Sequence, residues 1–287
     1  MSAYYRPASV EHAVALLNTH DDLIVLAGGT DIYPARTARA AWGQRNTANV
    51  LDISRLDALR GVEDRGDHWW IGALTTWTDL IHAPLPPVFA ALTTAARAIG
   101  GVQIQNRGTI VGNCCTASPA GDGIPCLLTL DAEFEVTGRA AFRIPAAQFF
   151  TGYRKTALDR CGLMTGIRIP KQAGHSAFHK LGARAYLVIS IAMVAGVVQT
   201  DGHGRVTSVR FAVGACAATA QRLPALEDAL LGQHLDPAIA MADHFGHLTP
   251  IDDIRASAAY RRHAALQVTR DVIATLAGLV RGEANHV

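Results

Sequence analysis

Apolar residues along the first half of the chain are spaced so that helices and strands alternate. Residues 10–17 carry them at helical spacing after Pro7 and Ser9, which are typical of helix starts. Residues 88–99 are rich in alanine at helical spacing and end at two glycines. Short apolar or alternating runs that suit strands occupy residues 23–26, 49–53, 68–72, 132–137 and 163–169. The pattern predicts mixed α and β structure.

Two stretches of small residues interrupt this pattern. The apolar run 23–26 stops at residues 27–29, and Asp31 then begins a segment that suits a helix, so we expect a strand, a tight turn and a helix. Residues 114–125 are dense in small residues and turn formers. We expect this second stretch to be extended and tightly packed, with its backbone close to another group.

The second half of the chain predicts an antiparallel ribbon followed by helices. Residues 187–199 and 205–215 suit two strands, and the pair Asp201-Gly202 between them is a strong hairpin signal. Helical patterns follow at residues 226–231, 237–245 and 257–280, the last with Ser257 at the N-cap position. These elements predict an α+β domain.

Length and one polar segment divide the chain into two domains. At 287 residues the chain exceeds the usual size of a single domain. Residues 171–176 are polar and contain a glycine, as domain boundaries commonly do. We therefore expect one domain at residues 1–172 and a second at residues 173–287.

Composition indicates a folded protein that does not bind nucleic acid and does not span a membrane. Hydrophobic residues make up 49% and charged residues 17% of the chain, which is ample for a core. The 26 basic and 24 acidic residues form no run long enough to follow a phosphate backbone. The longest apolar stretch, residues 186–198, is shorter than a membrane span and suits a buried strand. Since the N-terminus shows no signal peptide, we expect a cytoplasmic location.

The cysteines and histidines indicate no metal site and no disulfide framework. The five cysteines are odd in number and contain no Cys-x-x-Cys pair, so we expect free and mostly buried thiols. On an extended segment, Cys114 and Cys115 would face opposite sides, with one of them near any bound group. The 12 histidines form no compact metal-binding signature.

The turn at Gly28 and Gly29 allows two interpretations. Between a strand and a helix, such a turn can present consecutive backbone N–H groups and form an anion site suited to a diphosphate. Taken alone, it is more often an ordinary tight turn. The chain contains neither the G-x-G-x-x-G fingerprint nor a P-loop, so neither a standard NAD site nor an ATPase site is indicated.

A second glycine segment changes this assessment. Residues 107–113 (Arg-Gly-Thr-Ile-Val-Gly-Asn) lead into residues 116–122 (Thr-Ala-Ser-Pro-Ala-Gly-Asp). Together with residues 27–31, they resemble the FAD-binding medium subunits of the molybdenum hydroxylases, the family of xanthine dehydrogenase, aldehyde oxidoreductase and aerobic carbon monoxide dehydrogenase. The resemblance covers nearly the whole chain, including residues 5–9, 106–109, 149–156 and 257–263. It implies an α+β fold: a two-lobed FAD-binding domain followed by a smaller α+β domain with an antiparallel sheet and a helical bundle.

The resemblance puts FAD between the two glycine segments. The residues that it implies around the diphosphate are Val25, Leu26, Ala27, Gly28, Gly29, Thr30, Asp31 and Ile32 on one side and Thr109, Ile110, Val111, Gly112 and Asn113 on the other. It also implies a contact between Asp122 and the cofactor, in which the carboxylate could accept from a sugar hydroxyl. Met164 would lie against the isoalloxazine ring, and Lys180 near its polar edge, where a cation stabilises negative charge on the reduced flavin. Without the resemblance, Met164 would be interpreted as a core residue and Lys180 as a surface charge.

Two positions depart from the family pattern. Val111 stands where the second segment usually has glycine, which adds a side chain at a crowded point. Ile99 stands where xanthine dehydrogenases tend to have an aromatic residue beside the ring. FAD stays the expected cofactor, with an altered environment around the flavin.

The resemblance implies an electron-transfer subunit of a larger oxidoreductase. A large subunit with the molybdenum cofactor would hydroxylate the substrate, a small iron–sulfur subunit would relay electrons to the FAD, and the complex would be a heterotrimer or its dimer. The flavin would pass the electrons to an external acceptor such as NAD, oxygen or a quinone, so no side chain need act as acid or nucleophile. Two alternatives remain: a self-sufficient FAD-dependent oxidoreductase of the same wider fold, and a FAD-free scaffolding subunit, which Val111 would favour.

Overall fold

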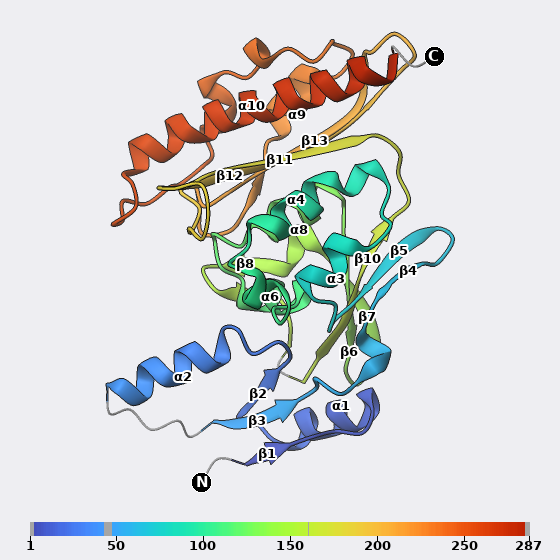
Figure 1. The fold of residues 1–287 in the computed structure, drawn as a ribbon, viewed down its shortest axis with the longest axis vertical. Helices are drawn as coiled ribbons and strands as arrows, with labels where there is room; N and C mark the ends of the chain where they lie inside the picture. The colour runs from blue at the N-terminus through green and yellow to red at the C-terminus, as the bar shows by residue number, and fades with distance from the viewer. Residues whose placement is uncertain (1–2, 43–47, 160, 285–287) are drawn as a thin grey trace.

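The computed structural model describes residues 3–42, 48–159 and 161–284. Along its longest axis the molecule consists of a small N-terminal lobe, a middle lobe that holds most of the helices, and a C-terminal domain (Figure 1). The longest helix lies at the opposite end of the molecule from the N-terminus. This α+β arrangement agrees with the fold expected from the sequence.

The N-terminal lobe is a three-stranded parallel sheet in the order β1-β3-β2. Its elements are β1 (Tyr4–Tyr5), α1 (Val10–Thr19), β2 (Leu23–Leu26), α2 (Ile32–Ala41) and β3 (Asn49–Asp52). Ser9 caps α1 by accepting a hydrogen bond from the N–H of His12, and α1 buries Ala13 and Leu17 against the sheet and the core. The helix predicted at residues 10–17 and the strand predicted at residues 23–26 are confirmed.

Asp52 joins β1 to β3. Its buried carboxylate accepts hydrogen bonds from the hydroxyl of Tyr4 at 2.7 Å, from Nε of Arg6 at 3.1 Å and from the N–H of Ser54 at 3.0 Å. Burial alone would raise the pKa of Asp52, but the hydrogen bonds from Ser54, Tyr4 and Arg6 outweigh it and lower the pKa from 3.8 to about 2.

We expect Asp52→Asn to cost about 2 kcal/mol of stability at neutral pH, because a depressed carboxyl pKa stabilises the folded state wherever the unfolded group is ionised. That contribution is present above the ordinary carboxyl pKa and is lost as the pH falls through the folded-state value. Urea unfolding of both proteins between pH 7 and about pH 2 measures it. A stability difference that does not shrink in acid would contradict this account.

The middle lobe contains a five-stranded antiparallel sheet in the order β4-β5-β10-β6-β7. Its strands are β4 (Val62–Asp64), β5 (His68–Gly72), β6 (Glu133–Thr137), β7 (Ala141–Pro145) and β10 (Leu163–Pro170), with a separate hairpin of β8 (Phe150–Gly152) and β9 (Lys155–Thr156). Its helices are η1 (Asp57–Leu59), α3 (Trp77–His82), η2 (Pro87–Phe89), α4 (Ala90–Ala98), α5 (Val102–Gln105), α6 (Ile110–Thr116), α7 (Gly123–Thr129) and α8 (Ala146–Phe149). The strands predicted at residues 68–72, 132–137 and 163–169 are confirmed.

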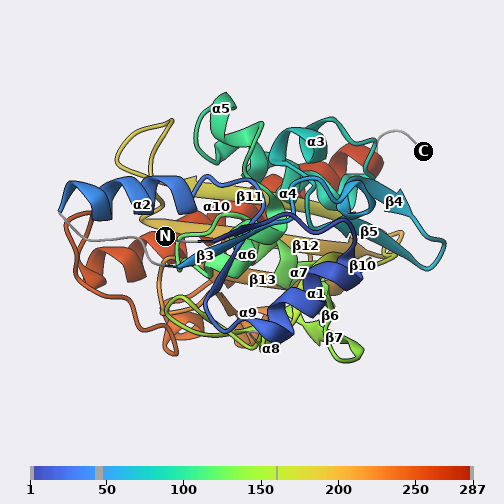
Figure 2. The ribbon, with the colours of Figure 1, turned by 90° about the horizontal axis from the view of Figure 1, so that it is seen from below.

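The C-terminal domain is a four-stranded antiparallel sheet in the order β11-β12-β13-β14 with helices on its outer face. Its elements are β11 (His175–Leu181), β12 (Ala192–Thr200), β13 (Val206–Gly214), β14 (Gln221–Arg222), α9 (Pro224–Leu230), η3 (Pro237–Ile239), η4 (Ala242–Phe245) and α10 (Ala258–Ala284). Helix α10 packs on β11 and β12, while α4 and α7 of the middle lobe also contact this sheet (Figure 2). The hairpin predicted at Asp201 is confirmed, and the Ser257 hydroxyl accepts from the N–H of Tyr260 as an N-cap would.

Residues 114–125 are not extended, and this prediction was wrong. The first of them complete α6, Ala117 follows in the left-handed conformation with φ 46°, and α7 begins at Gly123. A Cβ on Gly123 would lie 2.8 Å from the ring of Trp77. The small residues therefore allow short helices to pack closely. The local sequence alone does not distinguish such closely packed helices from a loop.

The predictions for the second half also need corrections. β12 begins only at Ala192, because Leu187 takes a left-handed conformation with φ 53° and Tyr186 and Ile189 are exposed in a loop. β11 begins inside the segment expected to separate the domains and was not predicted. Residues 237–245 form two short 3-10 turns in place of one helix. Within the described ranges, no helix is both long and apolar enough to cross a membrane.

Candidate functional site

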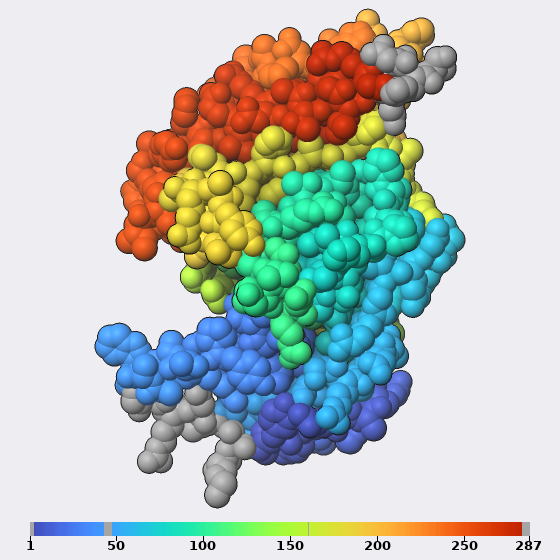
Figure 3. All heavy atoms as spheres, in the orientation of Figure 1, coloured from blue at the N-terminus to red at the C-terminus, as the bar shows by residue number. Residues whose placement is uncertain are grey.

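A cleft of about 380 Å³ opens between the N-terminal and middle lobes. Residues 24–32 except Leu26, which run from β2 into α2, line one side. Residues between 99 and 116, from the end of α4 into α6, line the other. Trp77 on α3 also contributes to the lining. In the space-filling view, the surface is notched on one side above α2 (Figure 3).

The two lining segments meet through glycine backbone. A Cβ on Gly28 would lie 2.0 Å from the carbonyl oxygen of Arg107. A Cβ on Gly108 would lie 3.0 Å from the carbonyl oxygen of Ile104 and 3.4 Å from Oγ1 of Thr30. A backbone carbonyl cannot rotate away as a side chain can, so only glycine fits at position 28. The pairing of the two glycine segments, inferred from the sequence, is thus a direct contact.

The first segment presents free backbone donors to the cleft. Gly29 has a φ of 77°, in the left-handed region that favours glycine, where the chain turns from β2 towards α2. Within the described part of the chain, no group accepts a hydrogen bond from the N–H of Gly28, Gly29 or Thr30. Unpaired N–H groups before a helix attract anions. This segment is therefore suited to a phosphate group.

The second segment is held in place by hydrogen bonds at the start of α6. Oγ1 of Thr109 accepts from the N–H of Gly112 at 3.0 Å. The N–H of Ile110 donates to the carbonyl of Thr75 at 3.2 Å, which ties α6 to the loop before α3. Residues 109–113 therefore form the capped first turn of a helix.

Val111 points into the core. Its side chain is 4% exposed, Ile110 is fully buried, and neither residue lines the cleft, whereas Gly112 and Asn113 do. The valine that departs from the family pattern therefore adds no atoms to the lining of the cleft. This observation removes the reason for expecting a chain that has lost its cofactor.

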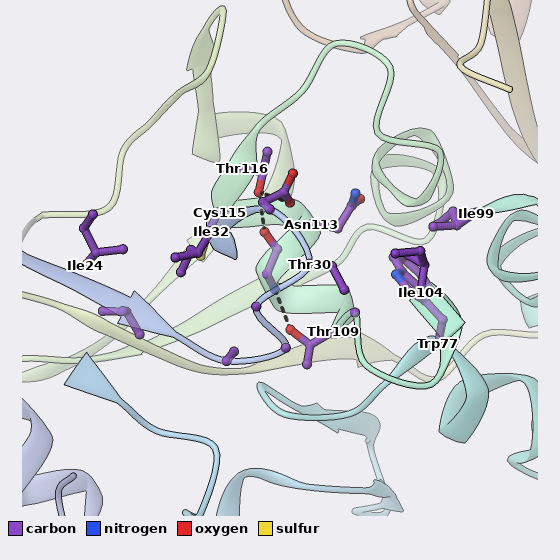
Figure 4. A pocket seen from close by; sticks show the side chains of 17 residues that line it. Ile24, Thr30, Ile32, Trp77, Ile99, Ile104, Thr109, Asn113, Cys115 and Thr116 are labelled. Carbon is purple, nitrogen blue, oxygen red and sulfur yellow. Dashed lines mark hydrogen bonds between the residues drawn. The ribbon is translucent and has the colours of Figure 1, made fainter. Parts of the chain in front are cut away.

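The two ends of the cleft are apolar (Figure 4). Ile24, Ile32 and Cys115 lie at one end, and Ile99 and Ile104 lie at the other. The polar side chains between these ends are Thr30, Asp31, Thr109, Asn113 and Thr116. A ligand with two flat, largely apolar ends and an anionic middle has this distribution of chemistry.

Two polar groups in the middle of the cleft bear on its use. Oγ1 of Thr116 donates to Oδ2 of Asp31 at 2.9 Å, which links α6 to the start of α2. Oδ1 of Asn113 is buried and has no hydrogen-bond partner among the described residues. A buried amide oxygen without a partner is costly, so a bound ligand that supplies a donor would stabilise the site.

A buried ion pair lies beside the Ile99 end of the cleft. Nζ of Lys180 is 2.5 Å from Oδ2 of Asp122 and 3.3 Å from the carbonyl oxygen of Ala98, the residue before Ile99. The hydroxyl of Ser190 donates to Oδ1 of Asp122 at 2.5 Å. Burial raises the pKa of Asp122, and the Lys180 ammonium and the hydrogen bonds of Lys180 and Ser190 oppose that rise. Both oxygens of the carboxylate are thus engaged within the protein.

Most of the predicted site residues meet at the cleft. Those that line it are Val25, Ala27, Gly28, Gly29, Thr30, Asp31, Ile32, Thr109, Gly112 and Asn113. Those that are buried behind the lining are Leu26, Ile110 and Val111. Asp122 and Lys180 form the adjoining ion pair. Met164 lies on β10 in the core, 2% exposed, and is not among the lining residues.

Four other lining residues were not predicted as part of the site: Ile24, Trp77, Ile104 and Thr116. Gly108 of the second glycine segment, Ile99, which was expected beside the flavin ring, and Cys115 also line the cleft. Cys115 lines the cleft, while Cys114 is buried. The two thiols face different sides as expected, but they do so on a helix and not on an extended segment. Cys115 is three residues after Gly112, a spacing that would have indicated a shared face once α6 was recognised. Ser190 carries no local signal, because it meets Asp122 only through the tertiary fold.

Comparison with known proteins identifies both parts of the chain. Residues 1–172 match the family described as the FAD binding domain in molybdopterin dehydrogenase. Residues 176–276 match the family described as the CO dehydrogenase flavoprotein C-terminal domain.

Relatives over nearly the full length belong to the same group. The chain is 31% identical to the nicotine 6-hydroxylase medium subunit of Paenarthrobacter nicotinovorans, over 94% of this chain and 95% of that protein. It is 32% identical to the carbon monoxide dehydrogenase medium chain of Hydrogenophaga pseudoflava, over 93% and 94%. The fold also matches a chain in a solved structure of carbon monoxide dehydrogenase from Hydrogenophaga pseudoflava, which lacks the Mo-pyranopterin moiety of the molybdenum cofactor. That chain is 31% identical, and the match has a TM-score of 0.88 and covers 97% of this chain and 98% of that chain.

Fold, cleft and relatives together define a flavoprotein component of an oxidoreductase, with a FAD-binding domain in this chain. The chain belongs to the family of FAD-binding medium subunits of the molybdenum hydroxylases. The resemblance inferred from the sequence is confirmed.

Proposed function

We propose that FAD binds in the cleft with its diphosphate between residues 28–30 and residues 109–113. The contact of Gly28 with the carbonyl of Arg107 carries this proposal, because it joins the two glycine segments, so that residues from both line a single cleft. The free N–H groups of residues 28–30 and the unpartnered amide oxygen of Asn113 support it.

We infer that the isoalloxazine ring lies at the Ile99 end and the adenine at the end formed by Ile24, Ile32 and Cys115. Both ends offer apolar side chains on which a flat ring can rest. The Lys180 ammonium beside the Ile99 end supports this direction, since the flavin is the part of FAD that gains negative charge on reduction. Met164 would support the site from the core.

The residues of this chain bind and tune the cofactor. When bound, FAD supplies the two-electron chemistry. Lys180 provides a fixed positive charge, and Asp122 and Ser190 hold that charge in place. The sugar contact expected for Asp122 is compatible with its role in fixing Lys180, because each carboxylate oxygen has one partner and can accept a second hydrogen bond.

We propose that the chain is the electron-transfer subunit of a molybdenum hydroxylase. It would receive electrons from a small iron–sulfur subunit, beside a large subunit with the molybdenum cofactor, and pass them to an external acceptor. The names of the relatives, medium subunit and medium chain, support a place in such a complex. A self-sufficient FAD enzyme and a FAD-free scaffold are the competing functions.

Purification of the complex from its source through a tag on this chain tests the function. We expect FAD, molybdenum and iron to copurify, and the flavin of the chemically reduced complex to reoxidise when NAD, oxygen or a quinone is added. A complex that carries Gly28→Ala serves as the control, because it should keep its metals and lose the flavin step. An active FAD-containing monomer without molybdenum and iron would instead support the self-sufficient enzyme, and a complex without FAD would support the scaffold.

A further inference from the structure

Arg261 is a buried arginine of the C-terminal domain whose partners adjoin the segments that carry Lys180, Ser190 and Asp122. This residue lies on α10, within the segment 257–263 that resembles the family, and is 2% exposed. Its Nη1 donates to the carbonyl of Ile191 at 2.7 Å and to the carbonyl of Ala215 at 3.1 Å, and its Nη2 donates to Oδ1 of Asp253 at 2.7 Å. The two terminal nitrogens of the guanidinium let one side chain bond these three acceptors from two separate atoms.

The hydrogen bond from Arg261 to the carbonyl of Ile191 holds Ser190 and the end of β11, which carries Lys180. The N–H of Ile191 donates to the carbonyl of Leu181 at 2.8 Å, so Ile191 is held from both sides. Leu181 follows Lys180 directly, and Ser190 precedes Ile191 directly. A shift of Ile191 would therefore move Ser190 and the end of β11 together.

The bond to Ala215 fixes the segment that carries the carboxylate. The N–H of Ala215 donates to the carbonyl of Pro119 at 2.9 Å. Pro119 lies three residues before Asp122, between α6 and α7. Arg261 thus bonds the segment of Ser190 directly and reaches the segment of Asp122 through the further hydrogen bond of Ala215 to Pro119.

Anchoring Asp253 would not by itself require Arg261. Oδ1 of Asp253 also accepts from the N–H groups of Arg255 and Ala256, and Oδ2 pairs with the Arg255 guanidinium at 2.7 Å. That loop therefore has closing hydrogen bonds of its own. The two carbonyl bonds of Arg261 have no such substitute among the described residues.

We propose that Arg261 is a positioning residue for the flavin: through Ile191 and Ala215 it holds Ser190 and Asp122 so that the Lys180 ammonium keeps its place beside Ala98. This inference rests on the proposed function, in which the flavin ring lies at the Ile99 end. A cation favours the reduced flavin only while its distance is fixed, because the interaction falls as the charge moves into solvent.

The midpoint potential of bound FAD, measured by spectroelectrochemistry on the FAD-loaded chain, tests this proposal. We expect Arg261→Met and Ser190→Ala each to lower the preference for reduced over oxidised FAD by about tenfold, a shift of about 30 mV to more negative potential for a two-electron couple. Arg262→Met, at the exposed neighbouring position on α10, is the matched control and should leave the potential unchanged. In a Lys180→Met background, Ser190→Ala should have little further effect.

Each result decides the matter. Variants that bind FAD and keep the potential of the Arg262→Met control would overturn the role of Arg261. If Arg261→Met does not fold, Ser190→Ala still tests the proposal, because the effect of Arg261 passes through the Ser190 hydroxyl: an unchanged potential in Ser190→Ala would overturn the proposal, and the expected shift would support it. A wild-type chain that takes up no FAD would refute the proposed function, so the two failures are distinguishable.

Discussion

Gly28→Ala should abolish retention of FAD during purification and raise its dissociation constant at least about 100-fold, or about 2.7 kcal/mol. The added methyl group would lie 2.0 Å from the carbonyl oxygen and 2.8 Å from the carbonyl carbon of Arg107. Because both atoms belong to the backbone, the segments must separate, and overpacking of this kind costs about 1–3 kcal/mol or more. The separation would pull the diphosphate donors of residues 28–30 away from residues 109–113.

Gly278→Ala is the matched control for this variant. Gly278 lies in α10, and, apart from its chain neighbours and the adjacent backbone of this helix, no atom of the described residues is within 4 Å of the position of an added Cβ. Alanine in a helix interior is favoured over glycine by about 0.5–1 kcal/mol, so this variant should keep FAD and unfold at a slightly higher temperature. Fluorescence titration of the FAD-free proteins with FAD measures both affinities. A Gly28→Ala chain with wild-type affinity would show that the contact does not form the site.

Lys180→Met should lower the free energy of unfolding by about 3–5 kcal/mol at neutral pH, because it leaves the buried carboxylate of Asp122 without its cation. The side chains of the pair are 12% and 5% exposed. The double variant Lys180→Met/Asp122→Leu should be more stable than Lys180→Met alone, since it removes the unpaired charge. Urea unfolding measures each stability.

The pH dependence of Lys180→Met gives a second signature. Burial already raises the pKa of Asp122, so the folded chain holds this proton more tightly than the unfolded chain does. The stability that protonated Asp122 contributes is therefore greatest in acid and is lost as the pH rises through the folded-state pKa. Without Lys180 the pKa rises further, so the deficit of the variant should grow from about pH 4 towards neutral pH.

Lys171→Met provides a surface comparison. Lys171 pairs with Asp64 at 2.5 Å, the same distance as in the buried pair, but the two side chains are 36% and 50% exposed. Exposed pairs contribute about 1 kcal/mol or less, so this variant should be nearly as stable as the wild type. If Lys180→Met were no more destabilising than Lys171→Met, the buried pair would have no special role.

The sequence predicts elements well where a local pattern and the tertiary fold agree. The helix after Ser9, the strand ending before Gly28 and the hairpin at Asp201 each have a periodic apolar pattern and a matching cap or turn residue. The pairing of the two glycine segments came from the family resemblance. No local signal indicates that the backbone at Gly28 lies against Arg107.

The errors have tertiary causes. Residues 114–125 look like a loop because they are small, yet they are small because neighbours occupy the space: a Cβ on Gly121 would lie 3.2 Å from Oδ1 of Asn113. Leu187 belongs to an apolar run that predicts a strand, but its left-handed conformation places it in a loop. Ser190 and Arg261 act through partners more than 60 positions away, at Asp122 and Ile191, which no local spacing can reveal.

The structure of the chain with bound FAD is the most direct test of the central claim. We expect the diphosphate between residues 28–30 and residues 109–113, the isoalloxazine ring beside Ile99 with the Lys180 ammonium at its edge, and the adenine near Ile24. A chain that binds no FAD, or FAD whose diphosphate lies away from Gly28, would contradict it.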